Sequence, residues 1–162
     1  MAHAAGNSYI EAILNLVDGS ESELIMTSPF IQEAGMSCLE GSLVEALGRG
    51  VEILLLTLQA ENLSSSQSIA IEELRREACR MGKTLKVFTV EAGSRAMIHA
   101  KLVISDRARV IIGSANLTGL GLEQSFEAGV ILGAKEASEA VNAVFGLFDS
   151  GLARLVFSTE HR

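Results

Sequence analysis

Apolar residues recur along the chain with two spacings that alternate. Segments with apolar residues at intervals of three and four, typical of helices with one buried face, alternate with short unbroken apolar runs, typical of buried strands. Glycines and Ser-Pro or Asp-Gly pairs separate these segments. The helical spacing predicts four helices, over Tyr9–Val17, Leu39–Leu47, Ile71–Met81 and Ala137–Phe148.

The apolar runs predict the strands of a sheet. They cover Glu23–Thr27, Val51–Thr57, Leu85–Val90, Lys101–Ser105, Arg109–Ile112 and Phe126–Leu132, with Leu155–Phe157 as an edge strand. Asp106 and Arg107 form a turn signal, which predicts a hairpin. Polar residues predict a loop over Glu61–Ser68. Alternating helices and strands predict an α/β sandwich.

Length and composition indicate one domain over residues 1–162, with flexible ends at 1–7 and 159–162. No apolar run approaches the ~18 residues that cross a bilayer, so we expect no membrane span. Cys38 and Cys79 lack the spacing of a paired motif and lie in helix-like stretches, which predicts reduced core thiols in a cytoplasmic protein.

The net charge of −7 argues against nonspecific binding of nucleic acid, but the charge is unevenly distributed. The segment Arg75–Arg109 holds nine basic and three acidic residues. Such a segment predicts a positive zone in an acidic body. An open alternative is that Arg75, Arg76 and Arg80 form only the solvated face of a helix.

Histidine limits the chemistry that the chain can perform. Of the three histidines, His3 and His161 lie at the ends of the sequence, so His99 is the candidate for chemistry with a fixed imidazole. This count argues against a mononuclear zinc site with three histidines, or with two cysteines and two histidines, as ligands, and we expect no cofactor.

His99 opens the one motif that points to catalysis, with the pattern H-x-K-x4-D-x6-G-S-x-N. Its residues are His99, Lys101, Asp106, Gly113, Ser114 and Asn116. Six specified positions make this pattern far more specific than a lone glycine fingerprint.

The spacing has a physical interpretation. His99 and Lys101 are two apart and would share one face of a strand. Asn116 follows a Gly-Ser turn that could bring its amide to the same pocket, and Glu127, on the next strand, could accept a hydrogen bond from His99. An oriented imidazole beside a lysine and an amide suits nucleophilic attack on phosphorus.

Each residue also has a structural interpretation. A lone histidine in a strand is usually a core residue. A catalytic role of His99 is favoured because the chain also has Lys101, Asn116 and Glu127 at positions that could bring them to the same pocket. Glu127 lies in a strand that looks buried, where a carboxylate needs a partner. For Asp106 a turn-forming role is favoured over direct catalysis.

These residues resemble the HKD signature of the phospholipase D superfamily, with Glu127 in place of its downstream acidic residue. The resemblance extends upstream to Ser28-Pro29-Phe30 and to Gly-Arg-Gly-Val-Glu-Ile-Leu-Leu-Leu-Thr. It implies a mixed sheet between helices, a phosphohistidine intermediate and no metal. It also implies two motif copies per active site, whereas this chain has one.

Small bacterial single-motif endonucleases of this superfamily meet that requirement as symmetric dimers, and the chain has their size and layout. We therefore expect a homodimeric, metal-independent phosphodiesterase of the nuclease type, with DNA favoured over RNA. The stretch after Gly113 also resembles phospholipase D-like proteins of phage-defence systems of the DISARM type, which would supply partner proteins.

Two other classes of function remain open. One is hydrolysis or transfer of phospholipids, for which no exposed apolar segment stands out in the sequence. The other is a non-catalytic module of a defence complex, which the acidic composition and the low aromatic content of 4% leave possible.

Overall fold

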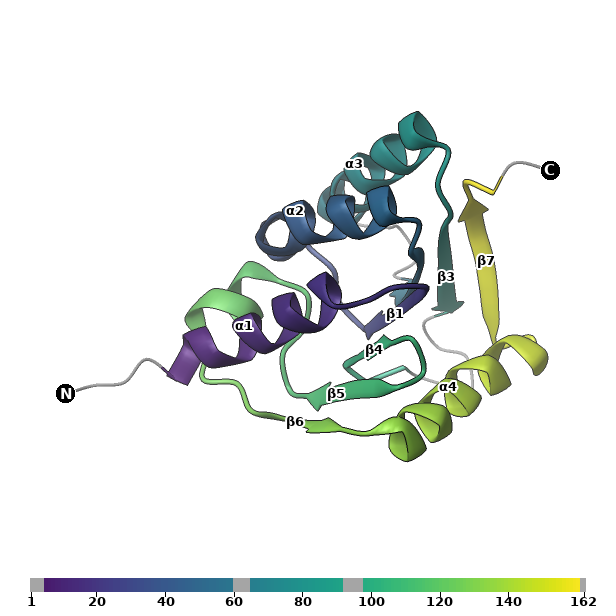
Figure 1. Ribbon diagram of the computed structural model, residues 1–162. Coiled ribbons are helices and arrows are strands. Elements are labelled where there is room, and N and C mark those ends of the chain that lie inside the picture. Colours follow the sequence, from purple (N-terminus) through teal and green to yellow (C-terminus); the bar gives the residue numbers. More distant parts are fainter. Residues whose placement is uncertain (1–4, 60–64, 92–97, 161–162) are drawn as a thin grey trace.

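The computed structural model describes residues 5–59, 65–91 and 98–160 and centres on one seven-stranded sheet (Figure 1). The strand order is β6-β5-β4-β1-β2-β3-β7. The strands are β1 (Glu23–Ser28), β2 (Glu52–Gln59), β3 (Leu85–Glu91), β4 (Leu102–Ser105), β5 (Arg109–Gly113), β6 (Gly129–Leu132) and β7 (Ala153–Ser158). The helices are α1 (Ala5–Asp18), α2 (Glu33–Arg49), α3 (Ser65–Met81) and α4 (Ala134–Asp149), with a short π-helix, η1 (Leu120–Gln124).

Strand directions decide which loops lie together. β1, β2 and β3 are parallel and end at the same edge of the sheet, which we call the carboxyl edge. β4 is antiparallel to β1, β5 to β4 and β6 to β5. The start of β4, the end of β5 and the start of β6 therefore all lie at the carboxyl edge, whereas the β4–β5 turn lies at the opposite edge.

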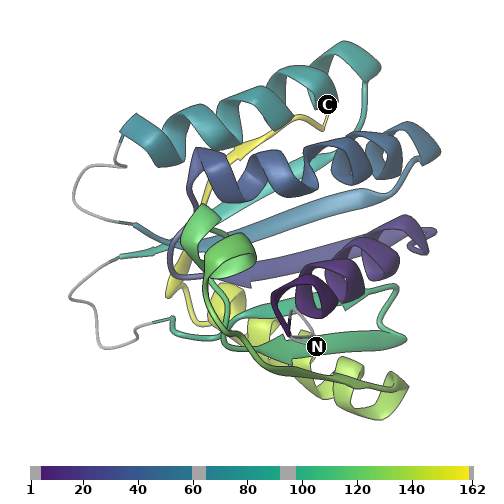
Figure 2. The same ribbon diagram turned by 90° about the vertical axis from the view of Figure 1, so that its left-hand side faces the viewer.

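Helices cover both faces of the sheet. α1, α2 and α3 lie on one face and α4 on the other (Figures 1 and 2). β1 is buried on both sides: Leu24 and Met26 join the core under α1–α3, and Ile25 joins the core under α4. Burial on both faces explains its unbroken apolar sequence. No helix among the described residues combines the length and apolarity needed to span a membrane.

The predicted mixed α/β sheet between helices is confirmed, but several local predictions are wrong. Cys38 is only partly buried and Cys79 is exposed, so neither is the core thiol that the sequence predicted. The predicted loop Glu61–Ser68 overlaps α3, which begins at Ser65. The predicted strand Phe126–Leu132 begins only at Gly129. Thr159, expected in a flexible end, is buried, and its hydroxyl donates to the Lys83 carbonyl at 2.6 Å. The spacing of apolar residues indicates that a helix or strand exists but does not fix the residue at which it begins or ends.

Asp106 closes the β4–β5 hairpin. Asp106 and Arg107 both have positive φ angles, of 53° and 55°, and the Ala108 N–H donates to the Ser105 carbonyl at 2.9 Å. Positive φ at both central residues is the geometry of a type I′ turn, in which aspartate is favoured. The turn role predicted for Asp106 is confirmed.

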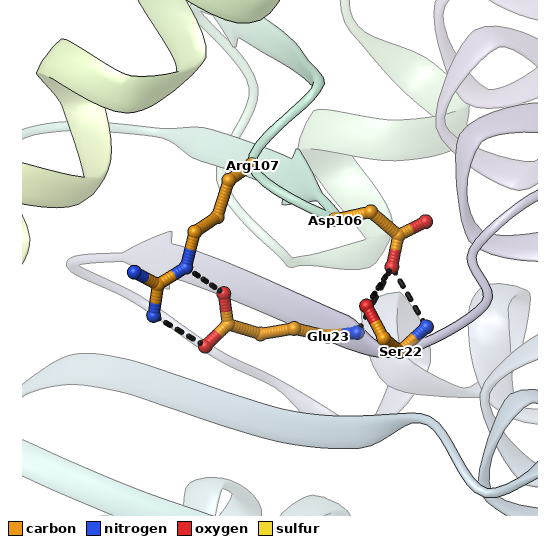
Figure 3. A network of polar contacts seen from close by, with 4 residues as sticks. All are labelled: Ser22, Glu23, Asp106 and Arg107. Carbon is orange, nitrogen blue, oxygen red and sulfur yellow. Dashed lines mark hydrogen bonds and ion pairs between the residues drawn. The ribbon is translucent and has the colours of Figure 1, made fainter.

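The Asp106 carboxylate also ties the hairpin to the start of β1 (Figure 3). It accepts hydrogen bonds from the backbone N–H groups of Glu21, Ser22 and Glu23 at 2.7–3.0 Å and from the Ser22 hydroxyl at 2.8 Å. Beside it, the Arg107 guanidinium forms an ion pair with Glu23 at 2.9 Å. Burial raises the pKa of the Asp106 carboxyl, but the three backbone N–H donors together outweigh burial and hold this pKa well below its usual value.

Replacing Asp106 with alanine is expected to lower the free energy of unfolding by about 2–3 kcal/mol at pH 7, because several hydrogen bonds to a charged acceptor are lost. The native pKa lies below the unfolded value, so this stabilisation is present above about pH 4 and disappears as the pH falls towards the native pKa. Urea unfolding at pH 7 and pH 3 measures both effects. Asp149→Ala, at the exposed end of α4, is the matched control, and equal losses in both variants would contradict the assignment.

Candidate active site at the carboxyl edge

The carboxyl edge brings together three parts of the motif that the sequence separates. Lys101 directly precedes β4, Gly113 ends β5 and Gly129 begins β6. The Gly113 N–H donates to the Lys101 carbonyl at 3.2 Å, and Gly113 is paired with Gly129. Lys101, Gly113 and Gly129 therefore form one row across three adjacent segments of the chain. His99, Asn116 and Glu127 each lie within three positions in sequence of a member of this row.

His99 and Lys101 are neighbours at the surface. His99 is exposed and Lys101 is partly buried. The Lys101 ammonium donates to the His99 carbonyl at 3.2 Å, and its Nζ atom lies 3.5 Å from Nδ1 of the His99 ring. A cation this close to an exposed imidazole is placed to hold an anionic group against the ring.

Thr27, the next-to-last residue of β1, fixes the backbone of the His99–Lys101 segment. Its hydroxyl donates to the Ala100 carbonyl at 3.0 Å and accepts from the Leu102 N–H at 3.1 Å. Thr27 is only 2% exposed. It therefore holds both sides of Lys101 from a buried position.

Ser28 does the same for the loop that carries Asn116. Its hydroxyl donates to the Phe30 carbonyl at 2.7 Å and accepts from the Leu117 N–H at 3.1 Å, and the Gln32 N–H donates to the Leu117 carbonyl at 2.9 Å. The sequence predicted Ser28 as a residue that follows a strand, without a role in holding the Asn116 loop. The available signal was two consecutive hydroxyl residues closing an otherwise apolar run.

Asn116 contains an unpaired polar atom. Its Oδ1 atom is buried, and no group of the described residues forms a hydrogen bond with it. Buried polar atoms without partners are uncommon away from functional sites. The unpaired atom is an acceptor, so it does not itself bind a phosphate oxygen, and the role that the motif implies falls to the Nδ2 donor of the same amide.

Glu127 departs from its expected environment. It precedes β6 instead of lying within the strand, and β6 is an exposed edge, with Val130 and Ile131 53% and 59% exposed. Its carboxylate contacts the Ser114 hydroxyl, while the Ala128 N–H donates to the same hydroxyl at 3.1 Å. The expectation of a buried strand is wrong. In this structure the Glu127 carboxylate contacts Ser114, and the expected hydrogen bond from His99 to Glu127 stays a prediction.

Tyr9 explains why glycine is needed at position 113. A Cβ atom at Gly113 would overlap the hydroxyl and ring of Tyr9, which is 8% exposed on α1, and one at Gly129 would lie 2.6 Å from the same ring. The ring thus lies directly on the backbones of β5 and β6. Burial and, secondarily, the Glu127 carboxylate raise the pKa of Tyr9 to about 12, so its hydroxyl stays protonated beside the site.

The described residues of the basic segment do not gather into the expected positive zone. Among the described residues, four of its cations are in ion pairs: Arg75 with Glu72, Arg80 with Glu77, Lys86 with Glu160 and Arg107 with Glu23. Arg75 and Arg80 belong to α3, and Arg107 lies at the edge opposite His99. Arg95 lies outside the described residues. The cations of this segment are therefore close in sequence but spread over distant parts of the structure, and Lys101 is the one among the described residues that lies beside His99.

Taken together, the edge offers an exposed imidazole, an adjacent ammonium, an amide whose oxygen is unpaired and a carboxylate that contacts a hydroxyl. Within the described ranges, no three His, Cys, Asp or Glu side chains are gathered as metal ligands. These groups suit attack on, and charge neutralisation at, a phosphate ester. Asp106 has no part in this chemistry, because it lies at the far end of β4.

Comparisons with known proteins agree with this geometry. The chain resembles the structure of Nuc from Salmonella typhimurium, a phospholipase D family member, with a TM-score of 0.70 and 18% identity over 90% of this chain and 88% of that one. The structure of NucT from Helicobacter pylori has a TM-score of 0.69 and 12% sequence identity to this chain, over 90% of each of the two chains. TrmBL2, an archaeal chromatin protein whose structure shows a novel mode of DNA binding, has a TM-score of 0.59 and 16% sequence identity. The match covers 92% of this chain and 51% of the TrmBL2 chain.

These structural likenesses show a shared fold. A search among curated proteins finds no match. The sequence profile of the family described as "Cardiolipin synthase, PLD-like domain" matches residues 13–147, which include the whole motif from His99 to Asn116 as well as Glu127. The chain therefore belongs to this family of PLD-like domains, within the phospholipase D superfamily.

Proposed function

We propose that this chain is a metal-independent nuclease that cleaves phosphodiesters through a phosphohistidine on His99. The observation that carries the proposal is the position of His99, exposed at the carboxyl edge with the Lys101 ammonium beside its ring. Lys101 and Asn116 would hold the non-bridging oxygens of the phosphate, and Ser114 would orient Glu127.

The proposed reaction has two balanced displacements. A ring nitrogen of His99 donates its electron pair to phosphorus, the bond to the leaving oxygen breaks, and that oxygen takes a proton from a second imidazolium. Water then attacks the phosphohistidine, gives its proton to the second imidazole and releases His99 with a phosphate monoester. Each half-reaction needs one histidine as nucleophile and another as acid or base.

The second imidazole is the reason for proposing a homodimer. His99 is the one histidine of the sequence away from its ends, so a matching imidazole at the same place comes from His99 of a second chain. Two-fold symmetry brings equivalent residues together across its axis. The exposure of His99 supports this proposal, because the ring is open to a second chain.

DNA is the proposed substrate. The likeness to TrmBL2, whose structure shows a mode of DNA binding, and to the small Nuc and NucT chains supports it. The family description names cardiolipin synthase, so phospholipid is the competing substrate. Hydrolysis of DNA, RNA and phosphatidylglycerol vesicles in excess EDTA separates these possibilities, and we expect cleavage of DNA. Strict dependence on added metal ion, or activity on vesicles alone, would refute the proposal.

Heterodimers test the shared site. Wild-type and His99→Ala chains with different tags are coexpressed, and the mixed dimer is isolated. Because one site needs both imidazoles, the mixed dimer should retain less than about 1% of wild-type activity. A mixed dimer with Leu155→Ala, an exposed residue of β7, should be fully active. Half of wild-type activity in the His99→Ala mixed dimer, or an active monomer by light scattering, would disprove sharing.

A further inference from the structure

The six phenylalanines of the chain divide into two groups by exposure. On the α4 face of the sheet, Phe148 stacks on Phe88 and meets Phe145 edge to face, and Phe157 packs against the core under α1–α3. Phe30 and Phe126, in contrast, are 52% and 81% exposed. Both belong to segments at the carboxyl edge, since one follows β1 and the other precedes β6.

Phe30 is held next to the motif. Its carbonyl accepts the Ser28 hydroxyl at 2.7 Å, and the following residue, Ile31, forms a parallel bridge with Leu117. Because that bridge is parallel, Phe30 lies beside Asn116, the residue that precedes Leu117. The backbone at Phe30 is therefore fixed while its ring remains exposed.

Phe126 borders the same segment from the other side. It directly precedes Glu127, whose carboxylate contacts the Ser114 hydroxyl. Two residues later, the Ala128 carbonyl accepts the Ser114 N–H at 3.0 Å. Two exposed phenylalanines thus belong to the segments that border Ser114–Asn116, Phe30 on the β1 side and Phe126 on the β6 side.

The charge distribution makes these rings important for binding. A duplex is bound mainly through contacts of Lys and Arg with phosphates, but the net charge is −7 and the ion pairs described above engage four cations of the basic segment away from the site. Stacking of a base on an aromatic ring needs no net charge and strengthens binding by about 5- to 150-fold per base. It requires bases that are not stacked inside a duplex.

We propose that Phe30 and Phe126 are base-stacking platforms on either side of the catalytic motif, and that the substrate is single-stranded nucleic acid. This inference rests on the proposed nuclease function and deepens it. The phosphate between two unpaired nucleotides lies at Lys101 and Asn116 while the flanking bases stack on the two rings.

Binding to the His99→Ala variant tests the inference without cleavage. Fluorescence anisotropy compares a 12-nucleotide DNA strand, the same sequence as a duplex, and a strand of equal length with abasic sites. We expect the single strand to bind at least about tenfold more tightly than either other ligand. Phe30→Ala and Phe126→Ala should each weaken single-strand binding about tenfold and leave abasic-strand binding unchanged. Leu155→Ala, on β7, is the matched control for an exposed apolar residue and should change nothing.

Conservative variants distinguish stacking from apolar contact. Phe126→Tyr should retain single-strand binding, whereas Phe126→Leu, which keeps apolar surface, should weaken it about as much as Phe126→Ala. Several outcomes would overturn the inference: equal affinity for duplex and single strand, a Leu variant that binds as wild type, dissociation of a dimer by Phe126→Ala in light scattering, or loss of vesicle binding instead of strand binding.

The same measurements separate this inference from the proposed function. If the wild-type protein cleaves none of the phosphodiesters tested but the anisotropy pattern holds, the nuclease proposal fails and the stacking sites stand. If DNA is cleaved in EDTA but the two phenylalanine variants bind and cleave single strands as wild type does, the stacking sites fail alone.

Discussion

Replacing His99 with alanine is expected to lower cleavage of DNA in EDTA by at least about 10⁴-fold. The variant removes the atom to which phosphorus becomes bonded, and losses of this size accompany removal of a nucleophile. Because His99 is exposed and its side chain packs in no core cluster, the thermal unfolding temperature should stay within a few degrees of wild type. Initial rates and a thermal melt on the same sample measure the two effects.

The lysines provide graded controls for this prediction. Lys101→Met keeps the nucleophile but removes the cation next to it, so we expect a loss of about 10²–10³-fold. Lys86→Met removes a cation paired with Glu160 at the start of β3 and should leave the rate unchanged. An acid-labile phosphate bound to wild type but not to His99→Ala would identify the intermediate. Retention of a tenth of wild-type activity by His99→Ala would exclude His99 as the nucleophile.

Replacing Gly35 with alanine should cause the largest loss of stability, about 3 kcal/mol or more. Gly35 is buried in α2, and a Cβ atom there would overlap backbone atoms of Leu117 and Thr118. Backbone held by the bonds from Ser28 and Gln32 cannot move aside as a flexible side chain would, so α2 or the Leu117 loop must shift. Because Asn116 precedes Leu117, the folded variant should also be less active.

Gly41 gives a matched control in the same helix. A Cβ atom at Gly41 meets nothing within 4 Å, so Gly41→Ala should stabilise the protein by about 0.5–1 kcal/mol through helix propensity. Urea unfolding of both variants measures the difference. If Gly35→Ala were as stable as Gly41→Ala, the close packing of α2 against the motif loop would be wrong.

The sequence was most informative where one segment determines its own structure. The apolar runs at β1, β2 and β3 and the turn at Asp106 depend on local spacing, and the structure confirms them. The motif likewise predicted that His99 and Lys101 would lie together, which they do, although both precede β4 instead of lying in a strand.

Features that depend on neighbours in space could not be predicted in this way. Val130 and Ile131 have the composition of a buried strand, but β6 is last in the strand order and one side of it has no neighbour. The hydroxyls of Thr27 and Ser28 act on residues more than 70 positions away. The partner of Glu127 also depends on how β5 and β6 pair, which no periodicity encodes.

The β4–β5 hairpin explains why Lys101 and Asp106 of the motif are separated by four residues. The four residues between Lys101 and Asp106 are the whole of β4, so the lysine and the aspartate mark the two ends of one strand. One inserted residue would turn Lys101 to the opposite face of the sheet or pull Asp106 away from Glu21–Glu23. The spacing between the lysine and the aspartate of the motif is therefore the length of β4. Asp106 anchors one end of this strand to the start of β1, and His99 and Lys101 are thereby held at the other end.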